Sequence, residues 1–182
     1  MNRTNIFTEQ EFFELKGSLV LKKFSKGDFI IKENDYVQDV YLISSGLVKL
    51  FYTDYDSKEH ILSFAFEDWW ETDFSAFYNK ERAVFSLQCI EDTEAYSLSY
   101  DDFFAACQNF TQLTDYFLAK SIRGHIANQK RILSLLTLNP KERYELFLQI
   151  YPSLSQRISK SVLASYLGVS RETLSRLYKQ HK

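Results

Sequence analysis

Cysteine, glycine, proline and histidine are all scarce in this chain of 182 residues. The two cysteines, Cys89 and Cys107, are too few for a disulfide framework or a four-cysteine iron–sulfur cluster, so we expect reduced thiols in a cytoplasmic protein. Five glycines and two prolines exclude a collagen-like or low-complexity chain. The histidines, His60, His125 and His181, lie in three separate segments, so we expect neither a metal site nor an enzyme.

Long apolar runs are also missing. No stretch approaches the roughly 18 apolar residues that a membrane span requires, so we expect no membrane partner. The segment from Met1 to Gln10 is polar and lacks the apolar centre of a signal peptide. In contrast, 45% of the residues are hydrophobic and 16% are aromatic, which is enough to build a hydrophobic core.

The net charge of −2 conceals a strong asymmetry. Residues 1–108 contain 10 of the 22 Lys and Arg and 20 of the 24 Asp and Glu, which gives −10. Residues 109–182 contain the other 12 and 4, which gives +8. This pattern predicts a basic module that meets a polyanion, joined to an acidic module with another role. A merely uneven distribution of charge is the alternative.

Residues 19–100 predict an all-β domain, because short β-branched and aromatic runs alternate with turn clusters. The predicted strands are Leu19–Phe24, Phe29–Lys32, Val40–Ser44, Leu47–Thr53, Glu59–Phe66, Ala83–Ile90 and Glu94–Ser99. Ser45-Gly46 indicates a tight hairpin between its flanking strands, since glycine readily takes a positive φ. Before these strands, the pattern from Phe7 to Leu15 predicts a short amphipathic helix.

Near residue 100 the apolar period changes from two to about 3.6, which indicates helices. We predict a short helix over Asp101–Ala106, a long helix from about Asn109 to Leu138, and a third over Pro140–Ile150 with Asn139 as its N-cap. The long helix has a narrow apolar stripe that fits a seam with a partner helix, and packing on its own β-domain is the alternative. The stripe consists of Leu118, Ile122, Ile126, Gln129, Leu133 and Leu136.

The last 24 residues predict a helix-turn-helix. Ser159 and Ser170 are good N-caps, and Gly168 suits a left-handed residue that ends the first helix. Ala164 is small enough for the second helix to cross closely, and Val169 can fill the corner. The side chains predicted to face inward are Val162, Leu163, Tyr166, Leu167, Leu174, Leu177 and Tyr178.

The outer face of the second helix has the chemistry of base reading. Arg171 and Arg176 could donate to guanine O6 and N7, and Glu172 could accept from cytosine N4. Phosphate contacts are predicted for a further set of polar side chains. These are Ser170, Thr173, Ser175 and Lys179. A helical hairpin with a solvated charged face is the alternative.

Residues 167–176, LGVSRETLSR, closely resemble the recognition-helix signature of the Crp/Fnr family of bacterial transcription regulators. The resemblance extends along nearly the whole chain. Residues 26–33 (KGDFIIKE) and 40–50 (VYLISSGLVKL) resemble that family's β-roll, and the helix from about Asn109 resembles its dimerisation helix.

The resemblance implies an α+β fold with three parts. A cyclic-nucleotide-binding-like sensor domain, an antiparallel double-stranded β-helix of jelly-roll type, covers residues 1–108. A dimerisation helix covers 109–138, with a seam at Leu118, Ile122, Ile126 and Leu133, and an all-α helix-turn-helix domain covers 139–182. The implied protein is a cytoplasmic homodimer that binds double-stranded DNA, and RNA polymerase as well if it is an activator.

The sequence departs from the family at the effector site. Nucleotide-binding members have a Gly-Glu pair and, about ten residues later, an Arg followed by a small residue. Here Thr72-Asp73 and Ala83-Val84 take those places, and Arg82 is one residue out of register, which on a strand reverses its facing. We therefore expect no cyclic nucleotide and identify no other cofactor. A nucleotide-responsive module that does not read DNA remains an alternative.

Two further points follow from the resemblance. Trp69-Trp70 and the neighbouring phenylalanines could line an apolar effector pocket, although residues of this kind more often belong simply to the core. These phenylalanines are Phe64, Phe66, Phe74 and Phe77. Most relatives continue into a two-stranded wing, whereas this sequence ends at Lys182, so we expect a short form with a shallower salt dependence of DNA binding.

Overall fold

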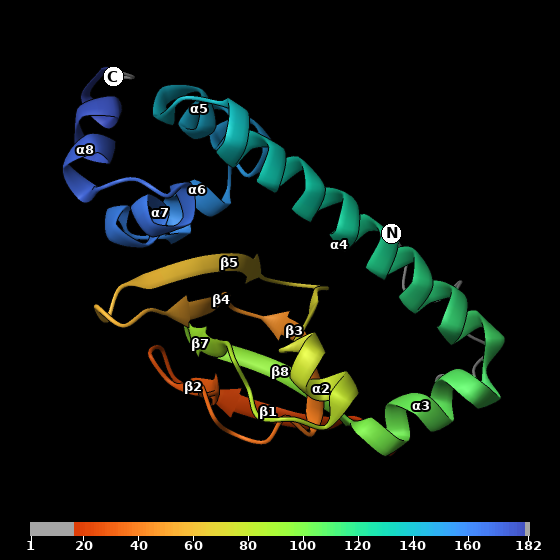
Figure 1. Cartoon of the computed structure of the whole chain (residues 1–182). Helices are drawn as coiled ribbons and strands as arrows, with labels where there is room; N and C mark the ends of the chain where they lie inside the picture. The colour runs from red at the N-terminus through yellow and green to blue at the C-terminus, as the bar shows by residue number, and fades with distance from the viewer. Residues whose placement is uncertain (1–16, 181–182) are drawn as a thin grey trace.

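The computed structural model describes the backbone of residues 17–180 and the side chains of residues 17–178. The helix predicted from Phe7 to Leu15 and the side chains of Lys179 and His181 lie outside this part of the chain. Within it, a β-roll of antiparallel strands is followed by a series of helices (Figure 1). The predicted α+β fold class is confirmed.

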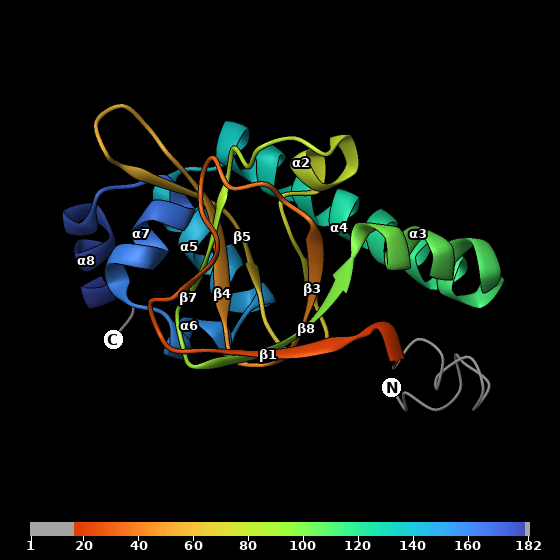
Figure 2. The ribbon, with the colours of Figure 1, turned by 90° about the horizontal axis from the view of Figure 1, so that it is seen from below.

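The β-roll consists of two four-stranded sheets in which every strand is antiparallel to its neighbours (Figure 2). The first sheet has the order β1 (Val20–Phe24), β8 (Thr93–Ser99), β3 (Asp39–Ser45) and β6 (Trp70–Glu71). The second sheet has the order β2 (Phe29–Ile31), β7 (Ser86–Cys89), β4 (Val48–Thr53) and β5 (Glu59–Ala65). Seven of these strands correspond to predicted ones, whereas the two-residue β6 is too short to leave a periodic signal.

The first hydrophobic core lies between the two sheets. Val40 and Ile43 of β3 and Val48 of β4 have no exposed surface, and neither do Leu87 of β7 and Leu98 of β8. Burial of one such aliphatic side chain contributes about 1.5–3 kcal/mol. The roll thus has a core of its own, as the aliphatic and aromatic runs of residues 19–100 predict.

The turn at Ser45-Gly46 is not the tight hairpin that the sequence predicts. β3 and β4 belong to different sheets, so the chain crosses from one sheet to the other at this point. Gly46 does have a positive φ of 100°. A Cβ there would lie 2.5 Å from the carbonyl oxygen of Asp92. The crossing requires glycine at this position. The sequence around it has the same pattern as that of a hairpin, so the sequence alone did not distinguish the two.

Seven helices are described within residues 74–180. They are α2 (Phe74–Asn79), α3 (Tyr100–Asn109), α4 (Thr111–Thr137), α5 (Pro140–Ile150), α6 (Leu154–Arg157), α7 (Lys160–Leu167) and α8 (Arg171–Gln180). Asn139 caps α5 in a capping box with Glu142, as its position before Pro140 suggests. The helices α2 and α6 were not predicted. In the described part of the chain no helix is both long and apolar enough to cross a membrane.

The helical unit α5–α8 packs on the outer face of the second sheet (Figure 1). A second hydrophobic core forms between them. Its buried members are Leu47, Phe51, Ile61 and Phe64 from the roll and Tyr144, Phe147, Leu154, Leu163, Ala164, Leu167 and Leu174 from the helices. The outer face of β4 and β5 therefore carries buried apolar side chains, and the helical unit and the roll form one packed body.

Helices also cover the free edge of the second sheet. β5 is the last strand of this sheet, so its outward carbonyl groups have no partner strand. Arg131 Nη2, on α4, donates to the Ile61 carbonyl at 2.7 Å, and Ser165 Oγ, on α7, donates to the Glu59 carbonyl. These two acceptors are two residues apart and therefore lie along the same edge. Side chains from α4 and α7 replace the missing strand there.

Candidate nucleic-acid interface

Local capping signals produce the helix-turn-helix. Ser159 Oγ accepts the Val162 N–H at 3.3 Å and begins α7. Gly168, with φ 66° and ψ 37°, ends α7 in the left-handed conformation, and the Val169 N–H bonds back to the Ala164 carbonyl at 3.0 Å. The turn thus has the backbone geometry that its sequence predicts.

The two helices cross at a buried contact. Ala164 of α7 and Leu174 of α8 are 2% and 0% exposed, so the small side chain lets α8 approach closely. Leu163 and Leu167 are buried, and Val162, Tyr166 and Leu177 are partly buried. Tyr178 differs from the prediction because it is 39% exposed and its ring supports the Lys160 ammonium at 4.2 Å.

The predicted base-reading side chains lie together on the exposed face of α8. Arg171, Glu172 and Arg176 are all exposed. Arg176 Nη2 lies 3.5 Å from Thr173 Oγ1, at the limit of a hydrogen bond. A backbone hydrogen bond, a hydrogen bond from Ser170 and the nearby Arg171 and Arg176 lower the pKa of Glu172, so its carboxylate can accept at neutral pH. Two donors and one acceptor therefore lie side by side on a single helix face.

The side chains predicted to contact phosphate have mixed positions. Ser170 Oγ accepts the Thr173 N–H at 3.1 Å and so caps α8, and it also lies 3.1 Å from Thr173 Oγ1. Ser175 is partly buried, whereas the side chain of Lys179 is not described. Ser170 and Thr173 therefore have a structural role that the sequence prediction did not assign to them.

A groove of about 350 Å³ lies beside the turn between α7 and α8. The hairpin that joins β4 to β5 contributes Lys58 and Glu59 to it, while Ala164 of α7, Val169 of the turn and Arg171 of α8 are among its other lining residues. His60 Nε2 contacts Asp54 Oδ2 at 2.6 Å across this hairpin, so the lone histidine of the roll has an ordinary hydrogen-bonded role. The β-roll thus reaches the edge of the surface on which Arg171 lies.

The apolar stripe of α4 does not pack on its own roll. Leu118, Ile122, Ile126 and Leu133 are between 44% and 59% exposed. The opposite face of α4 contacts the roll through Leu113, which is buried, and through aromatic side chains. Packing on the roll is therefore excluded as the reason for the stripe, and an apolar surface runs along the helix.

The aromatic residues near Trp70 fasten α4 to the roll. The Trp70 ring meets Phe117 edge-on with centroids 4.9 Å apart, and its Nε1 donates to Tyr116 Oη at 3.3 Å. Trp69 packs on Phe66 with ring centroids 5.8 Å apart. These contacts give the two tryptophans a role in the core of the fold.

The region that aligns with the family's effector site is occupied by a side chain of the protein itself, that of Asp73. Thr72 and Asp73 are buried, and Thr72 Oγ1 donates to the Asp39 carbonyl at 3.0 Å. Asp73 Oδ1 accepts the Ala76 N–H at 3.1 Å. Its Oδ2 accepts the N–H groups of Val84 and Phe85 at 2.9 and 3.0 Å. Three backbone donors are thereby committed to a carboxylate of the chain.

Arg82 lies away from these donors. It is exposed, its Nη1 donates to the Asn34 carbonyl at 2.7 Å, and its guanidinium stacks on Tyr36 at 4.2 Å. Ala83 is buried and the Val84 side chain is exposed. The guanidinium of Arg82 therefore contacts Asn34 and Tyr36, whereas the Val84 N–H contacts Asp73.

Residues 21–110 match the profile of the cyclic nucleotide-binding domain family. Similar solved structures include FixK2 from Bradyrhizobium japonicum, with a TM-score of 0.79 and 18% identity over 89% of this chain and 83% of that one. The c-di-GMP responsive regulator CLP from Xanthomonas campestris has a TM-score of 0.77 and 16% identity over 95% and 91% of the two chains. A protein from Eubacterium rectale assigned to the crp/fnr family of transcriptional regulators has a TM-score of 0.74 and 15% identity over 97% and 84%.

The chain has a Crp/Fnr-like fold. A search of curated protein sequences found no match to it. The similarity is one of fold and covers both the β-roll and the helices of this chain.

Sequence reasoning missed three arginines that hold the Crp/Fnr-like fold together. Arg131 binds the carbonyls of Ile61 and Tyr166, and Arg143 binds those of Leu138 and Leu167. Arg157 pairs with two carboxylates of the roll. These positive charges counted toward a polyanion-binding module, yet each guanidinium donates to groups of the protein itself. The position of Arg131 on α4, away from the apolar stripe, was the one available signal.

Proposed function

We propose that this chain is a homodimeric, sequence-specific DNA-binding transcription regulator. Arg171, Glu172 and Arg176 read bases from the major groove, and Ser170, Thr173, Ser175 and Lys179 contact phosphates. The observation that carries this proposal is the capped α8 helix, with two arginines and a carboxylate exposed on its first two turns. The Crp/Fnr-like fold supports it.

The proposed docking uses the N-terminal part of α8. Helix N-terminal residues reach base edges in this geometry, and an arginine can donate two hydrogen bonds to one guanine. Lys141 and Arg123 are also exposed, which adds positive charge to the helical part of the chain. Positive charge of this kind supplies affinity that is independent of sequence.

The exposed stripe on α4 supports the homodimer. Leu118, Ile122, Ile126 and Leu133 recur at spacings of four or seven residues, the pattern of a helix–helix seam. Two-fold symmetry then places the two α8 helices on half-sites about 34 Å apart on one face of the duplex. Replacement of Ile122 by Glu should convert the dimer to a monomer in sedimentation experiments, because a charge would be buried in an apolar seam.

For the effector site, we propose that a cyclic nucleotide does not bind between Asp73 and residues 83–85. The Asp73 carboxylate already accepts the N–H groups that an anion would need there. Calorimetry with cyclic AMP, cyclic GMP and cyclic di-GMP tests this point, the last because the similar protein CLP is c-di-GMP responsive. Saturable binding of a cyclic nucleotide that Arg82→Ala abolishes would contradict the proposal.

We also propose a regulatory role and no enzymatic one. The similar proteins CLP and the Eubacterium rectale chain are regulators, which supports this choice. If the protein activates transcription, RNA polymerase is the second partner that we propose.

The decisive experiment selects DNA sites from a random library with the purified full chain. The selected site is then titrated with Arg171→Ala and Arg176→Ala. Each variant should lose about 1–3 kcal/mol of specific binding, or about 5–150-fold, and should tolerate other bases at the position that its arginine contacts.

Lys141→Ala is the matched control, because it also removes one exposed positive charge from the helical unit. It should weaken binding to all sequences equally. Base reading by α8 is wrong if the two α8 variants bind every DNA as well as the parent chain does.

A further inference from the structure

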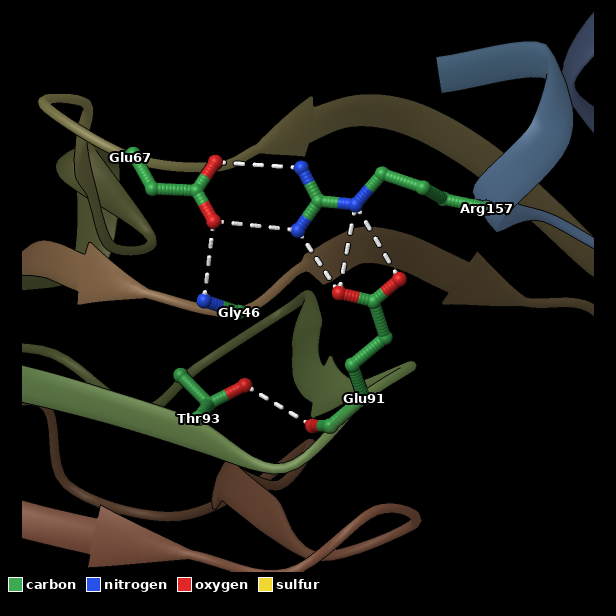
Figure 3. A network of polar contacts seen from close by, with 5 residues as sticks. All are labelled: Gly46, Glu67, Glu91, Thr93 and Arg157. Carbon is green, nitrogen blue, oxygen red and sulfur yellow. Dashed lines mark hydrogen bonds and ion pairs between the residues drawn. The ribbon is translucent and has the colours of Figure 1, made fainter. Parts of the chain in front are cut away.

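One guanidinium joins the helical unit to two turns of the β-roll (Figure 3). Arg157 is the last residue of α6. Its Nη1 and Nη2 donate to the two carboxylate oxygens of Glu67 at 3.0 and 3.1 Å, a bidentate pair. Its Nε and Nη2 donate to Glu91, with a shortest distance of 2.6 Å. We call these three residues the Arg157 clamp.

The two carboxylates come from different turns and are themselves fixed. Glu67 follows β5, and its Oε1 also accepts the Gly46 N–H at 3.1 Å. Glu91 lies between β7 and β8, and its carbonyl accepts the Thr93 hydroxyl at 2.9 Å. Figure 3 shows that Glu67 and Glu91 approach the guanidinium from different sides. The clamp therefore defines both the distance and the orientation of α6, since a planar fork matches a carboxylate in one orientation.

The C-terminal part of α7 is attached to the roll by a separate set of contacts. Ser165 Oγ donates to the Glu59 carbonyl, and Arg131 links the carbonyls of Ile61 and Tyr166. The Tyr166 ring packs on Phe64 with centroids 5.0 Å apart. Because Arg157 is only three residues before the start of α7, this helix is held at both ends on the second sheet.

The position of α8 on the roll depends on the position of α7. It is anchored through Leu174, which is fully buried in the core shared by α5, α7 and the second sheet. The chain connection from α4 to α5 is short, because α4 ends at Thr137 and α5 begins at Pro140. The placement of α8 relative to the dimer axis thus depends on this short connection and on the contacts of α6 and α7 with the roll.

We propose that Arg157 is a positioning residue that sets the separation of the two DNA half-sites. This inference depends on the proposed function, because it assigns a role within DNA binding by the dimer. In the intact clamp each α8 is held by its own β-roll, so the dimer accepts one half-site spacing. Each added base pair moves a half-site by about 3.4 Å along the duplex and about 34° around it. A clamp released by mutation lets the helical unit adjust to such changes.

The test uses a series of palindromes with the selected half-site at the preferred spacing and at one, two and three base pairs more or less. The parent chain should prefer one spacing by at least about tenfold. Arg157→Gln and Glu67→Gln should flatten this profile while binding to a single half-site stays within about twofold of the parent. Lys141→Gln, which removes an exposed charge outside the clamp, should lower the whole profile without flattening it.

An unchanged spacing profile in Arg157→Gln, with folded dimeric protein, overturns the proposal. A second measurement does not need DNA, so it separates this failure from failure of the proposed function. Amide hydrogen exchange in residues 154–167 should become about fivefold faster in Arg157→Gln, whereas exchange in β3 and β8 should not change. If exchange in residues 154–167 is unaltered, the clamp does not hold the helical unit, whatever the DNA result.

Discussion

A buried carboxyl group in the roll makes the stability of the protein depend on pH. Glu71 lies on β6 and is buried; its Oε2 accepts the Ser63 hydroxyl at 2.8 Å and its Oε1 the Thr72 N–H at 3.2 Å. Burial raises the pKa of Glu71 from 4.5 to about 7, and the negative charge of Asp73 adds to this rise, whereas the two hydrogen bonds oppose it. The folded chain therefore keeps this proton well above the pH at which the unfolded chain loses it.

The direction and size of the effect follow from proton linkage. Between about pH 4.5 and 7 the unfolded chain binds fewer protons at this site than the folded chain, so the free energy of unfolding falls as pH rises. One pKa unit corresponds to 1.36 kcal/mol, so the full loss above pH 7 is about 3 kcal/mol. Glu71→Gln carries no charge at any pH and keeps the shape of the side chain. The variant should therefore be more stable than the parent by about 2–3 kcal/mol at pH 8 and by much less at pH 5.

Urea unfolding of parent and variant at pH 5, 6, 7 and 8 measures this difference directly. Glu81→Gln serves as the control, because Glu81 is an exposed carboxylate on the same domain. Its stability difference from the parent should change little over this range. If the difference between Glu71→Gln and the parent is the same at every pH, the Glu71 carboxyl does not stay protonated in the folded roll and the reasoning is wrong.

Two further predictions concern packing. Gly46→Ala should destabilise the chain by about 2–4 kcal/mol in urea unfolding, because a positive φ and a Cβ 2.5 Å from the Asp92 carbonyl both oppose the side chain. An effect below about 1 kcal/mol would show that the backbone at the crossing between β3 and β4 relaxes freely. Leu174→Ala should cost about 2–5 kcal/mol, because the leucine has no exposed surface. The same variant should lose specific DNA binding but remain dimeric in sedimentation, and full retention of specific binding would mean that α8 does not depend on this contact.

Features that depend on neighbours in the chain could be predicted from the sequence. The caps at Ser159 and Ser170, the left-handed Gly168 and the Asn139-Pro140 start of α5 are signals that span a few residues, and all four are present in the structure. The exposure of the side chains that we propose to read bases follows from the same local register. Strand positions were also predictable, because they depend on alternation within five to seven residues.

Features that depend on distant partners could not be predicted in this way. At Gly46 the local pattern is compatible with a hairpin and with a crossing between sheets, and only the pairing of β3 with β8 and of β4 with β7 decides between them. Arg157 illustrates the same limit for charge. Its sequence position suggests attraction to DNA, but its two partners lie 66 and 90 residues away.

The covered edge of β5 affects how the chain behaves before it is completely folded. An exposed edge strand is a template on which other chains can add strands, and Ile61, Phe64 and Ala65 make this one apolar. Here the edge is capped by donors from helices that follow it in the chain, so it stays open until those helices have formed. A fragment that stops before α4, or a ribosome-bound chain of that length, should therefore aggregate through this strand, and α4 and α7 also protect the roll against self-association.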